Sequence, residues 1–310
     1  MVNWCMTIEV IKVKLFIDKL NEKIRKTDSR VCVGLDPHLN LIPEYLIEKA
    51  KKESSTNKEA LALAILEFNK KIIDNIYDLT AIVKPQIAFY EKIGIKGLEV
   101  LEKTINYAKD KDLLVLLDAK RNDIGSTVGA YAEAYLKNKN IDAITINPYL
   151  GLDGVNPFLQ YKDKGAFALV RTSNKSARDI QDIKSEEGNK IYEHVGQLVK
   201  KWGQDHIGES GYSNLGAVIG ATYPEELKKL RSIMKGVFFL IPGYGAQGGG
   251  AQDVVHGFDK EGLGAVVNSS RGIIFAYRNK KNYDIKEFAA AARESAKEMK
   301  ESINIEISKK

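Results

Sequence analysis

The sequence predicts an α/β protein, a (β/α)8 barrel of the TIM type. Eight short apolar segments recur along its 310 residues, and helical patterns lie between them. Within the segments the apolar residues run almost continuously, which is typical of strands buried on both faces of a parallel sheet. The count of eight favours a closed barrel over a doubly wound sheet with extra strands, which remains the alternative.

The eight predicted strands share interiors made almost wholly of apolar residues, as in Leu113–Leu117 and Val237–Ile241. In chain order they are Val31–Asp36, Ala81–Ile87, Leu113–Lys120, Ala143–Pro148, Ala166–Thr172, Leu215–Ala221, Val237–Pro242 and Gly264–Asn268.

Helices are predicted between and around these strands. Met1–Leu20 mixes charged and apolar residues as an amphipathic N-terminal helix does, and Lys58–Leu79 places apolar residues on one stripe. Thr222 to Glu225 resembles a capping box with a proline in the first turn, which predicts a helix ending near Met234. The alanine- and glutamate-rich Ile285–Ile303 is expected to close the chain as a helix.

No interdomain linker or internal repeat interrupts the pattern, so residues 1–310 are expected to form one barrel domain with an N-terminal and a C-terminal helix. Two stretches exceed what a minimal barrel needs, residues 51–57 and residues 174–213. Long loops on a barrel tend to be functional, so the second is a candidate lid.

The composition and the charge limit which binding partners and which compartment are expected for this protein. The chain is 44% hydrophobic and 28% charged, which are globular values, and 47 basic against 41 acidic residues give a net charge of +6. The basic residues form no long block and show no aromatic-interleaved pattern, so no nucleic-acid partner is expected. Cys5 and Cys32 offer neither metal spacing nor a disulfide framework, which favours a reducing cytoplasm, and no apolar run is long enough for a membrane span.

The polar residues at the strand ends carry the chemistry, because barrel active sites lie at the carboxyl ends of the strands. Asp118 and Lys120 are two apart on a strand, so they are expected on one face, with Asp123 in the following loop and Lys84 at a neighbouring strand end. A lysine flanked by carboxylates stays protonated, which suits electrostatic stabilisation and proton donation. A purely structural ion pair at a strand end is the alternative.

A glycine-rich segment, Gly243–Gly250, follows the seventh predicted strand, and Ser269–Gly272 follows the eighth. The loops after these two strands form the usual phosphate site of a barrel, with backbone N–H groups and an arginine as donors. Gln247 and Arg271 are the candidate phosphate ligands, and a flexible solvent loop is the alternative.

Together these motifs resemble the orotidine 5′-phosphate decarboxylase family, the lyases that make UMP in the last step of pyrimidine biosynthesis. The matching segments lie in family order between about residues 30 and 275, and two of them resemble the longer-chain, type 2-like branch. They are Cys32–Pro37, Val83–Gln86, Leu117–Ile124, Arg171–Asn174, Pro242–Gly249 and Asn268–Arg271.

The resemblance implies roles at the reacting end of the substrate. Lys120 matches the lysine that protonates carbon-6 of the pyrimidine after carbon dioxide leaves, and Asp118 matches the aspartate beside the departing carboxylate. Lys84 and Asp123 complete the alternating charge network. Asp123 and Thr127 match residues shared across a homodimer interface.

It also implies a binding set. Asp36 matches a ribose ligand, and Gln86 is a weaker candidate for substrate contact. Ser173 reads the pyrimidine edge and Pro242 lines its pocket. The phosphate ligands are Gln247, Arg271 and the backbone of Ser270. The family uses no cofactor or metal, and neither is expected here.

Two alternatives stay open. A metal-dependent sugar-phosphate decarboxylase or synthase of the same barrel group looks similar around Asp118, Lys120 and Asp123, but needs a carboxylate where Lys84 stands. A non-catalytic barrel that binds a phosphoribosyl ligand is the second, and the intact charge set argues against it.

Overall fold

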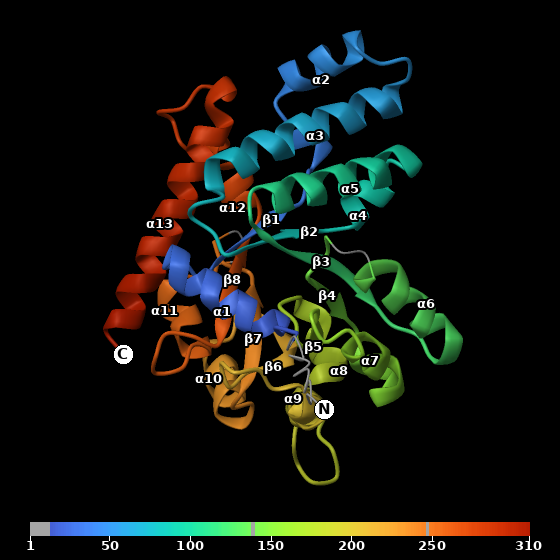
Figure 1. Ribbon diagram of the computed structural model, residues 1–310. Helices are drawn as coiled ribbons and strands as arrows, with labels where there is room; N and C mark the ends of the chain where they lie inside the picture. Colours follow the sequence, from blue (N-terminus) through green and yellow to red (C-terminus); the bar gives the residue numbers. More distant parts are fainter. Residues whose placement is uncertain (1–12, 138–139, 246–247) are drawn as a thin grey trace, which may run out of the picture.

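The protein, described by a computed structural model over residues 13–137, 140–245 and 248–310, is built around a closed parallel barrel. Each strand pairs with the next along the chain and β8 pairs with β1, so the (β/α)8 prediction is confirmed (Figure 1). That residues 1–310 form one domain stays a prediction. The strands are β1 (Val31–Leu35), β2 (Ile82–Pro85), β3 (Leu114–Arg121), β4 (Ala143–Ile146), β5 (Gly165–Arg171), β6 (Ser213–Ile219), β7 (Val237–Pro242) and β8 (Ala265–Ser269).

All eight strands form where the continuous apolar runs predict them, with each end within two residues of its predicted position. The helices are α1 (Phe16–Thr27), α2 (Glu44–Lys52), α3 (Asn57–Ile76), α4 (Ala88–Glu91), α5 (Ile95–Asp110), α6 (Gly125–Leu136), α7 (Leu152–Leu159), α8 (Arg178–Gln181), α9 (Ile191–Trp202), α10 (Pro224–Ile233), α11 (Ala251–Val254), α12 (Arg271–Ile274) and α13 (Phe288–Ser308). None of these helices combines the length and apolar character that a membrane span requires.

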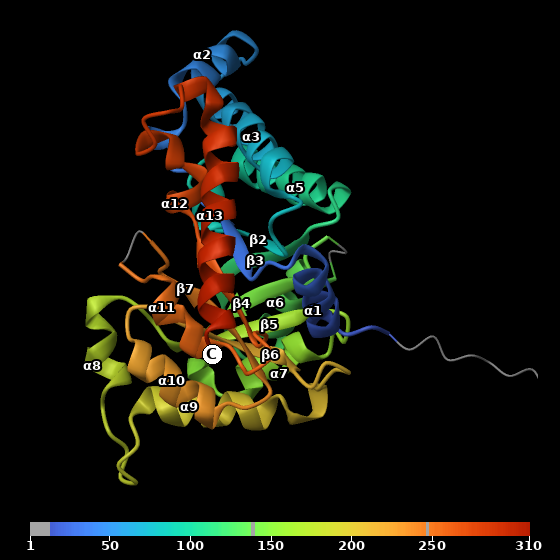
Figure 2. The same cartoon turned by 90° about the vertical axis from the view of Figure 1, so that its left-hand side faces the viewer.

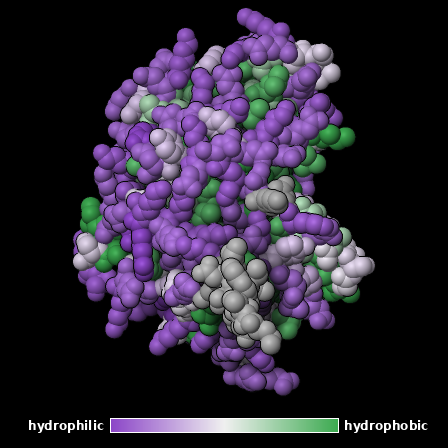
Figure 3. Space-filling view, viewed as in Figure 1, coloured by the Kyte–Doolittle hydropathy of each residue, from purple (hydrophilic) through white to green (hydrophobic). Residues whose placement is uncertain are grey.

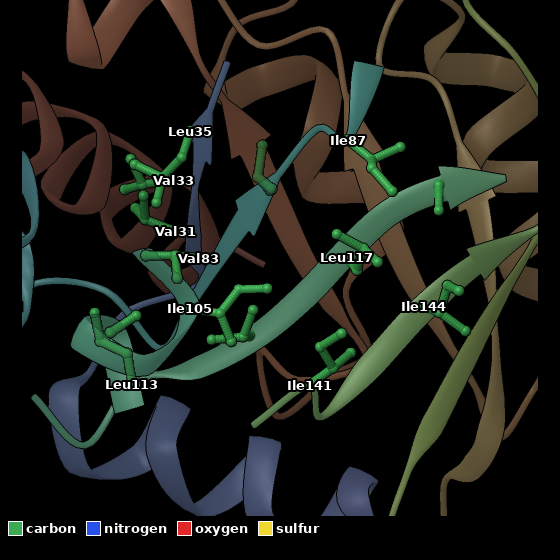
Figure 4. Packing of buried hydrophobic residues seen from close by; sticks show 14 of the residues in the cluster. Val31, Val33, Leu35, Val83, Ile87, Ile105, Leu113, Leu117, Ile141 and Ile144 are labelled. Atoms are coloured by element: carbon green, nitrogen blue, oxygen red, sulfur yellow. The ribbon is translucent and has the colours of Figure 1, made fainter. Parts of the chain in front are cut away.

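Alternate residues of each strand face opposite sides of the barrel wall. One set, with Val31, Val33 and Leu117, packs outward against the helices (Figure 4). The inward set includes Ile82 and Leu116. Because the side-chain period of a strand is two, Lys84 and Asp118 fall on the inward set, one step nearer the carboxyl end.

The N-terminal helix is α1, which begins at Phe16 and runs to Thr27, so the predicted span Met1–Leu20 is wrong at its C-terminal end, and residues 1–12 lie outside the described part. The helix continues past Leu20 because its apolar stripe includes Ile24, which is also buried. Phe16 meets Phe167 edge to face at 6.2 Å, and the backbone N–H of Ile17 donates to Asn214 at the start of β6. The helix therefore covers the amino ends of the strands and leaves the carboxyl ends open.

The other flanking elements refine the predictions. The closing helix α13 is preceded by a 3-10 turn at Ile285–Glu287, continues to Ser308, and lies alongside the barrel (Figure 2). It packs against α3, where Phe68 stacks on Phe288 with 4.9 Å between ring centroids.

The capping-box prediction is wrong, because Tyr223 occupies the N-cap position of α10 and the Thr222 hydroxyl has no hydrogen-bond partner among the described residues. Pro224 at the first helical position supplies the start signal instead.

Candidate active site

Three charged side chains meet at the carboxyl end of the barrel. Lys84 Nζ lies 2.9 Å from Asp118 Oδ2, and Lys120 Nζ lies 2.5 Å from Asp118 Oδ1. Lys84 is 4% and Asp118 8% exposed, whereas the Lys120 side chain is 45% exposed and open to a ligand. The structure thus brings together three of the four residues expected at the reacting end.

The cluster keeps its charges because the ions stabilise one another. Burial alone would raise the pKa of Asp118, but the attraction of Lys84 and Lys120 holds it well below its usual range. Burial opposes the charged form of Lys84, yet the attraction of Asp118 and Asp36 raises its pKa above the ordinary value. Near pH 7 the site therefore presents an ionised carboxylate next to a protonated buried lysine.

Thr145 of β4 holds this arrangement from the side. Its hydroxyl donates to Asp118 Oδ1 at 2.8 Å and accepts from the backbone N–H groups of Ala119 and Lys120, both at 3.0 Å. A role for Thr145 was not predicted from the sequence. The sequence did offer one indication: Thr145 is a hydroxyl residue within the otherwise apolar fourth strand, and no site residue was predicted for that strand.

Lys120 reaches the cluster by an irregular backbone. Its φ is 49°, in the left-handed region, and the pairing of β3 with β4 shifts register between Leu117 and Arg121. A non-glycine residue held there costs about 1–3 kcal/mol and is typical of functional sites. The predicted contact with Asp118 is confirmed, but regular strand alternation is not what produces it.

A cavity of about 490 Å³ opens beside the cluster and is mostly apolar. We call it the apolar lobe. Its walls come from the carboxyl ends of β2 to β7 and from the segment after β5, and they include Ser173 and Pro242, as expected. The lining residues are Lys84, Asp118, Lys120, Thr145, Leu169, Thr172, Ser173, Asn174, Gln181, Val218, Leu240 and Pro242.

A second cavity of about 440 Å³, the polar lobe, adjoins the first, and both are lined by Lys84, Asp118 and Pro242. The charge cluster therefore lies between an apolar and a polar compartment. The remaining lining residues come from β8, from the loops after β1, β7 and β8, and from the start of α12, namely Asp36, His38, Gly243, Tyr244, Asn268, Ser269, Ser270 and Arg271.

The polar lobe contains polar groups that have no partner among the described residues and could bind a ligand. Ser270 Oγ donates to Asp36 Oδ2 at 2.6 Å, while Asp36 Oδ1 is buried without a partner among the described residues. Gly34 makes this approach possible, because a Cβ there would collide with the Ser270 side chain. Arg271 starts α12, is exposed, and forms no ion pair with another described residue. An unpaired buried oxygen and an unpaired guanidinium suit a hydroxylated anion.

The other expected site residues are placed differently. Gln247 lies outside the described residues. Asp123 and Thr127 line neither lobe: Asp123 Oδ1 accepts from the backbone N–H of Ile124 at 2.8 Å, and Thr127 is exposed on α6. Gln86 lines neither lobe. Within one chain, Gln86, Asp123 and Thr127 therefore contribute to neither lobe.

Several lining residues were given no site role on sequence grounds, among them His38, Gln181 and Asn268. His38 lies in the segment after β1, where burial lowers the pKa of its imidazole below the usual value. Among the described residues, no group of three or more His, Cys, Asp or Glu side chains is placed to hold a metal ion.

The chain is similar to known proteins over most of its length. Residues 29–284 match the model of the orotidine 5′-phosphate decarboxylase / HUMPS family. The chain is 47% identical over 293 residues to the orotidine 5′-phosphate decarboxylase of Clostridium tetani, covering 93% of this chain and 98% of the relative.

Solved structures are similar too. The Leishmania donovani OMP decarboxylase is 32% identical with a TM-score of 0.75, over 95% of this chain and 99% of that one. The Plasmodium berghei orotidine 5′-monophosphate decarboxylase, at 22% identity and a TM-score of 0.79 over 95% of this chain and 98% of that one, shows the shared fold. By family model, identity and coverage, the chain belongs to the orotidine 5′-phosphate decarboxylase / HUMPS family.

Proposed function

We propose that this enzyme decarboxylates orotidine 5′-phosphate to UMP and carbon dioxide, and that Lys120 donates the proton that replaces the carboxylate. One observation carries the proposal: the Lys84–Asp118–Lys120 cluster lies where an apolar lobe meets a polar lobe. Family membership supports the same reaction.

The two lobes match the two halves of the nucleotide. The pyrimidine would occupy the apolar lobe, with Ser173 at its polar edge and Pro242 against the ring. The phosphoribosyl group would occupy the polar lobe, where Asp36 offers a free carboxylate oxygen to a ribose hydroxyl. Arg271 and the backbone of Ser270 would bind the phosphate, and Gln247 is proposed as a third phosphate ligand.

The chemistry needs preorganised charge. When the bond between carbon-6 and the carboxylate breaks, carbon dioxide leaves and its bonding electron pair stays on carbon-6. The Lys120 ammonium stabilises that pair and then transfers a proton to it, which leaves a neutral amine and UMP. Fixed charges aimed at developing charge commonly supply a large part of catalysis.

Asp118 orients Lys120 and places negative charge beside the departing carboxylate. Its carboxylate oxygens accept hydrogen bonds from Lys84 Nζ at 2.9 Å, from Lys120 Nζ at 2.5 Å and from the Thr145 hydroxyl at 2.8 Å. The carboxylate therefore has little freedom to move. A site held this firmly does not reorganise during the reaction.

We further propose a homodimer in which Asp123 and Thr127 complete the partner's site. Asp123 completes the charge network there, and both side chains lie outside their own chain's lobes. An exposed apolar group lies beside them: Ile124 is 57% and Leu150 45% exposed, and Gly154 adjoins both Asp123 and Leu150. Figure 3 shows hydrophobic surface on the side where α6 and α7 lie in Figure 1, on an otherwise mostly hydrophilic face. Such patches commonly mark protein interfaces.

A cytoplasmic location is part of the proposal. Cys32 is buried and unpaired, and burial raises the pKa of its thiol to about 12. A free cysteine is compatible with a reducing compartment.

The function is tested by following the loss of ultraviolet absorbance of orotidine 5′-phosphate with a metal chelator present. Wild-type protein should turn over, and Lys120→Ala should lose at least about 10⁴-fold in kcat, because both charge stabilisation and the proton donor are removed. The variant should keep the wild-type circular dichroism spectrum. Wild-type activity in Lys120→Ala would refute the role of Lys120, and loss of wild-type activity with chelator would favour the metal-dependent alternative.

Arg271→Ala should mainly weaken binding. Loss of a charge-assisted, forked contact to phosphate corresponds to roughly tenfold to hundredfold in the dissociation constant for UMP. Calorimetric titration measures it, with the exposed Arg278→Ala on the following turn as the control. Equal UMP affinity in Arg271→Ala and wild type would contradict the phosphate assignment.

Thr145→Val should lower kcat about fivefold to hundredfold, because Asp118 and two backbone N–H groups lose a partner worth about 1–3 kcal/mol. Thr104 is the matched control: it is buried, and its hydroxyl accepts from Asn69 at 3.2 Å, away from the site. Thr104→Val should keep kcat while losing thermal stability. If both variants keep kcat, Thr145 does not position Asp118.

The shared site is tested by mixing two inactive variants, Lys120→Ala and Asp123→Asn, after brief dissociation. Random pairing makes half of the dimers mixed, and one of the two sites in each mixed dimer is intact, so about a quarter of the wild-type activity should return. Each variant carried alone through the same treatment is the control. No recovery from a mixture shown to exchange subunits would mean that Asp123 acts within its own chain.

A further inference from the structure

The segment after β5 is anchored by a buried cation. Arg171, the last residue of β5, is 0% exposed; its Nε donates to Glu226 at 2.6 Å and its Nη2 donates to the other oxygen of the same carboxylate at 3.2 Å. Asp182 forms an ion pair with it at 3.1 Å. Arg171 begins the segment Arg171–Asn174 that resembles the family, but it lines neither lobe.

Aromatic rings hold the same guanidinium on further sides. The rings of Tyr192 and Tyr223 have their centroids 4.9 and 5.0 Å from it, and they come from α9 and from the N-terminus of α10. Arg171 is therefore a fixed donor just outside the apolar lobe.

Gln181, the last residue of α8, connects this anchor to the lobe. Its Oε1 accepts from Arg171 Nη1 at 3.3 Å and from the backbone N–H of Thr172 at 3.0 Å. Its Nε2 donates to Thr172 Oγ1 at 2.7 Å. Because a backbone N–H can only donate, the orientation of the amide is determined, and both of its ends bind the residue before Ser173.

The residue after Ser173 joins the same network, since the Thr172 hydroxyl donates to Asn174 Oδ1 at 2.7 Å. On the opposite side Gly220 permits a close approach, because a Cβ there would lie 3.0 Å from Ser173 Cβ. Ser173 and Gln181 both line the apolar lobe. Ser173 is thus held on both sides along the chain, while its own hydroxyl bonds to no other described residue.

We propose that Gln181 is a positioning residue for recognition of the pyrimidine: it fixes the turn that presents the Ser173 hydroxyl to the polar edge of the base. This inference rests on the proposed function, in which Ser173 contacts the pyrimidine. Gln181 acts through Thr172 and Ser173, so its effect depends on the base and is absent for the phosphoribosyl half of the ligand.

The experiment compares dissociation constants for UMP and for ribose 5-phosphate, which has the phosphate and sugar but no base. Gln181→Ala should weaken UMP binding about tenfold, the effect expected for lost positioning of one hydrogen bond, and should leave ribose 5-phosphate within about twofold. Gln197→Ala is the matched control, because Gln197 is an exposed glutamine on α9 of the same segment. Thermal midpoints of all variants check that the segment stays folded.

A double-mutant cycle with Ser173→Ala separates positioning from a structural role. If Gln181 acts through Ser173, the double variant should bind UMP no more weakly than Ser173→Ala alone. Unchanged UMP binding in Gln181→Ala, equal weakening of both ligands, or losses that multiply in the double variant would each overturn the inference.

The same binding titrations give a different result if the proposed function itself is wrong. Wild-type protein would then bind UMP no better than ribose 5-phosphate, and this outcome would overturn both. A second outcome separates the two proposals: wild-type protein binds UMP tightly and Ser173→Ala binds it equally well. The proposed function would then stand, but the contact between Ser173 and the base would be refuted, and the role of Gln181 with it.

Discussion

The buried ion pair between Lys84 and Asp118 is the interaction on which the site depends. Two such groups at 2.9 Å inside a barrel are costly to desolvate, and removing one leaves the other charged and unpaired. Their placement follows from neighbouring strands, since β2 and β3 pair directly and both residues belong to the inward-facing set. Lys120 and Thr145 then attach to the Asp118 carboxylate, so one oriented anion arranges the reacting groups.

The fold keeps stability and chemistry at opposite ends of the strands. At the amino ends α1 covers the barrel with Phe16 and Ile17, both almost completely buried. At the carboxyl ends the charge cluster lies where the polar lobe meets the apolar lobe, and the proposed binding mode places the reacting carbon there. The long segment after β5 contributes Gln181, which Arg171 at the end of β5 holds in place.

The sequence predicted the features that depend on local pattern. Continuous apolar runs located all eight strands, and Asp118, Lys120 and Lys84 were correctly expected to meet because they end strands at the same edge. It could not predict contacts that arise between distant segments, such as Thr145 beneath Asp118 or Gln181 beside Thr172. Nor could it foresee the left-handed backbone of Lys120, because only the surrounding structure makes that strain tolerable.

In the proposed mechanism, Lys120 transfers a proton to carbon-6 of the bound nucleotide. By microscopic reversibility, the enzyme should also remove that proton from UMP in deuterium oxide, with nuclear magnetic resonance following the carbon-6 signal at saturating nucleotide. Wild-type protein should replace this hydrogen by deuterium far faster than buffer alone, and Lys120→Ala should show only the buffer rate. Exchange at the wild-type rate in Lys120→Ala, with UMP binding confirmed by calorimetry, would contradict the role of Lys120 as the proton donor.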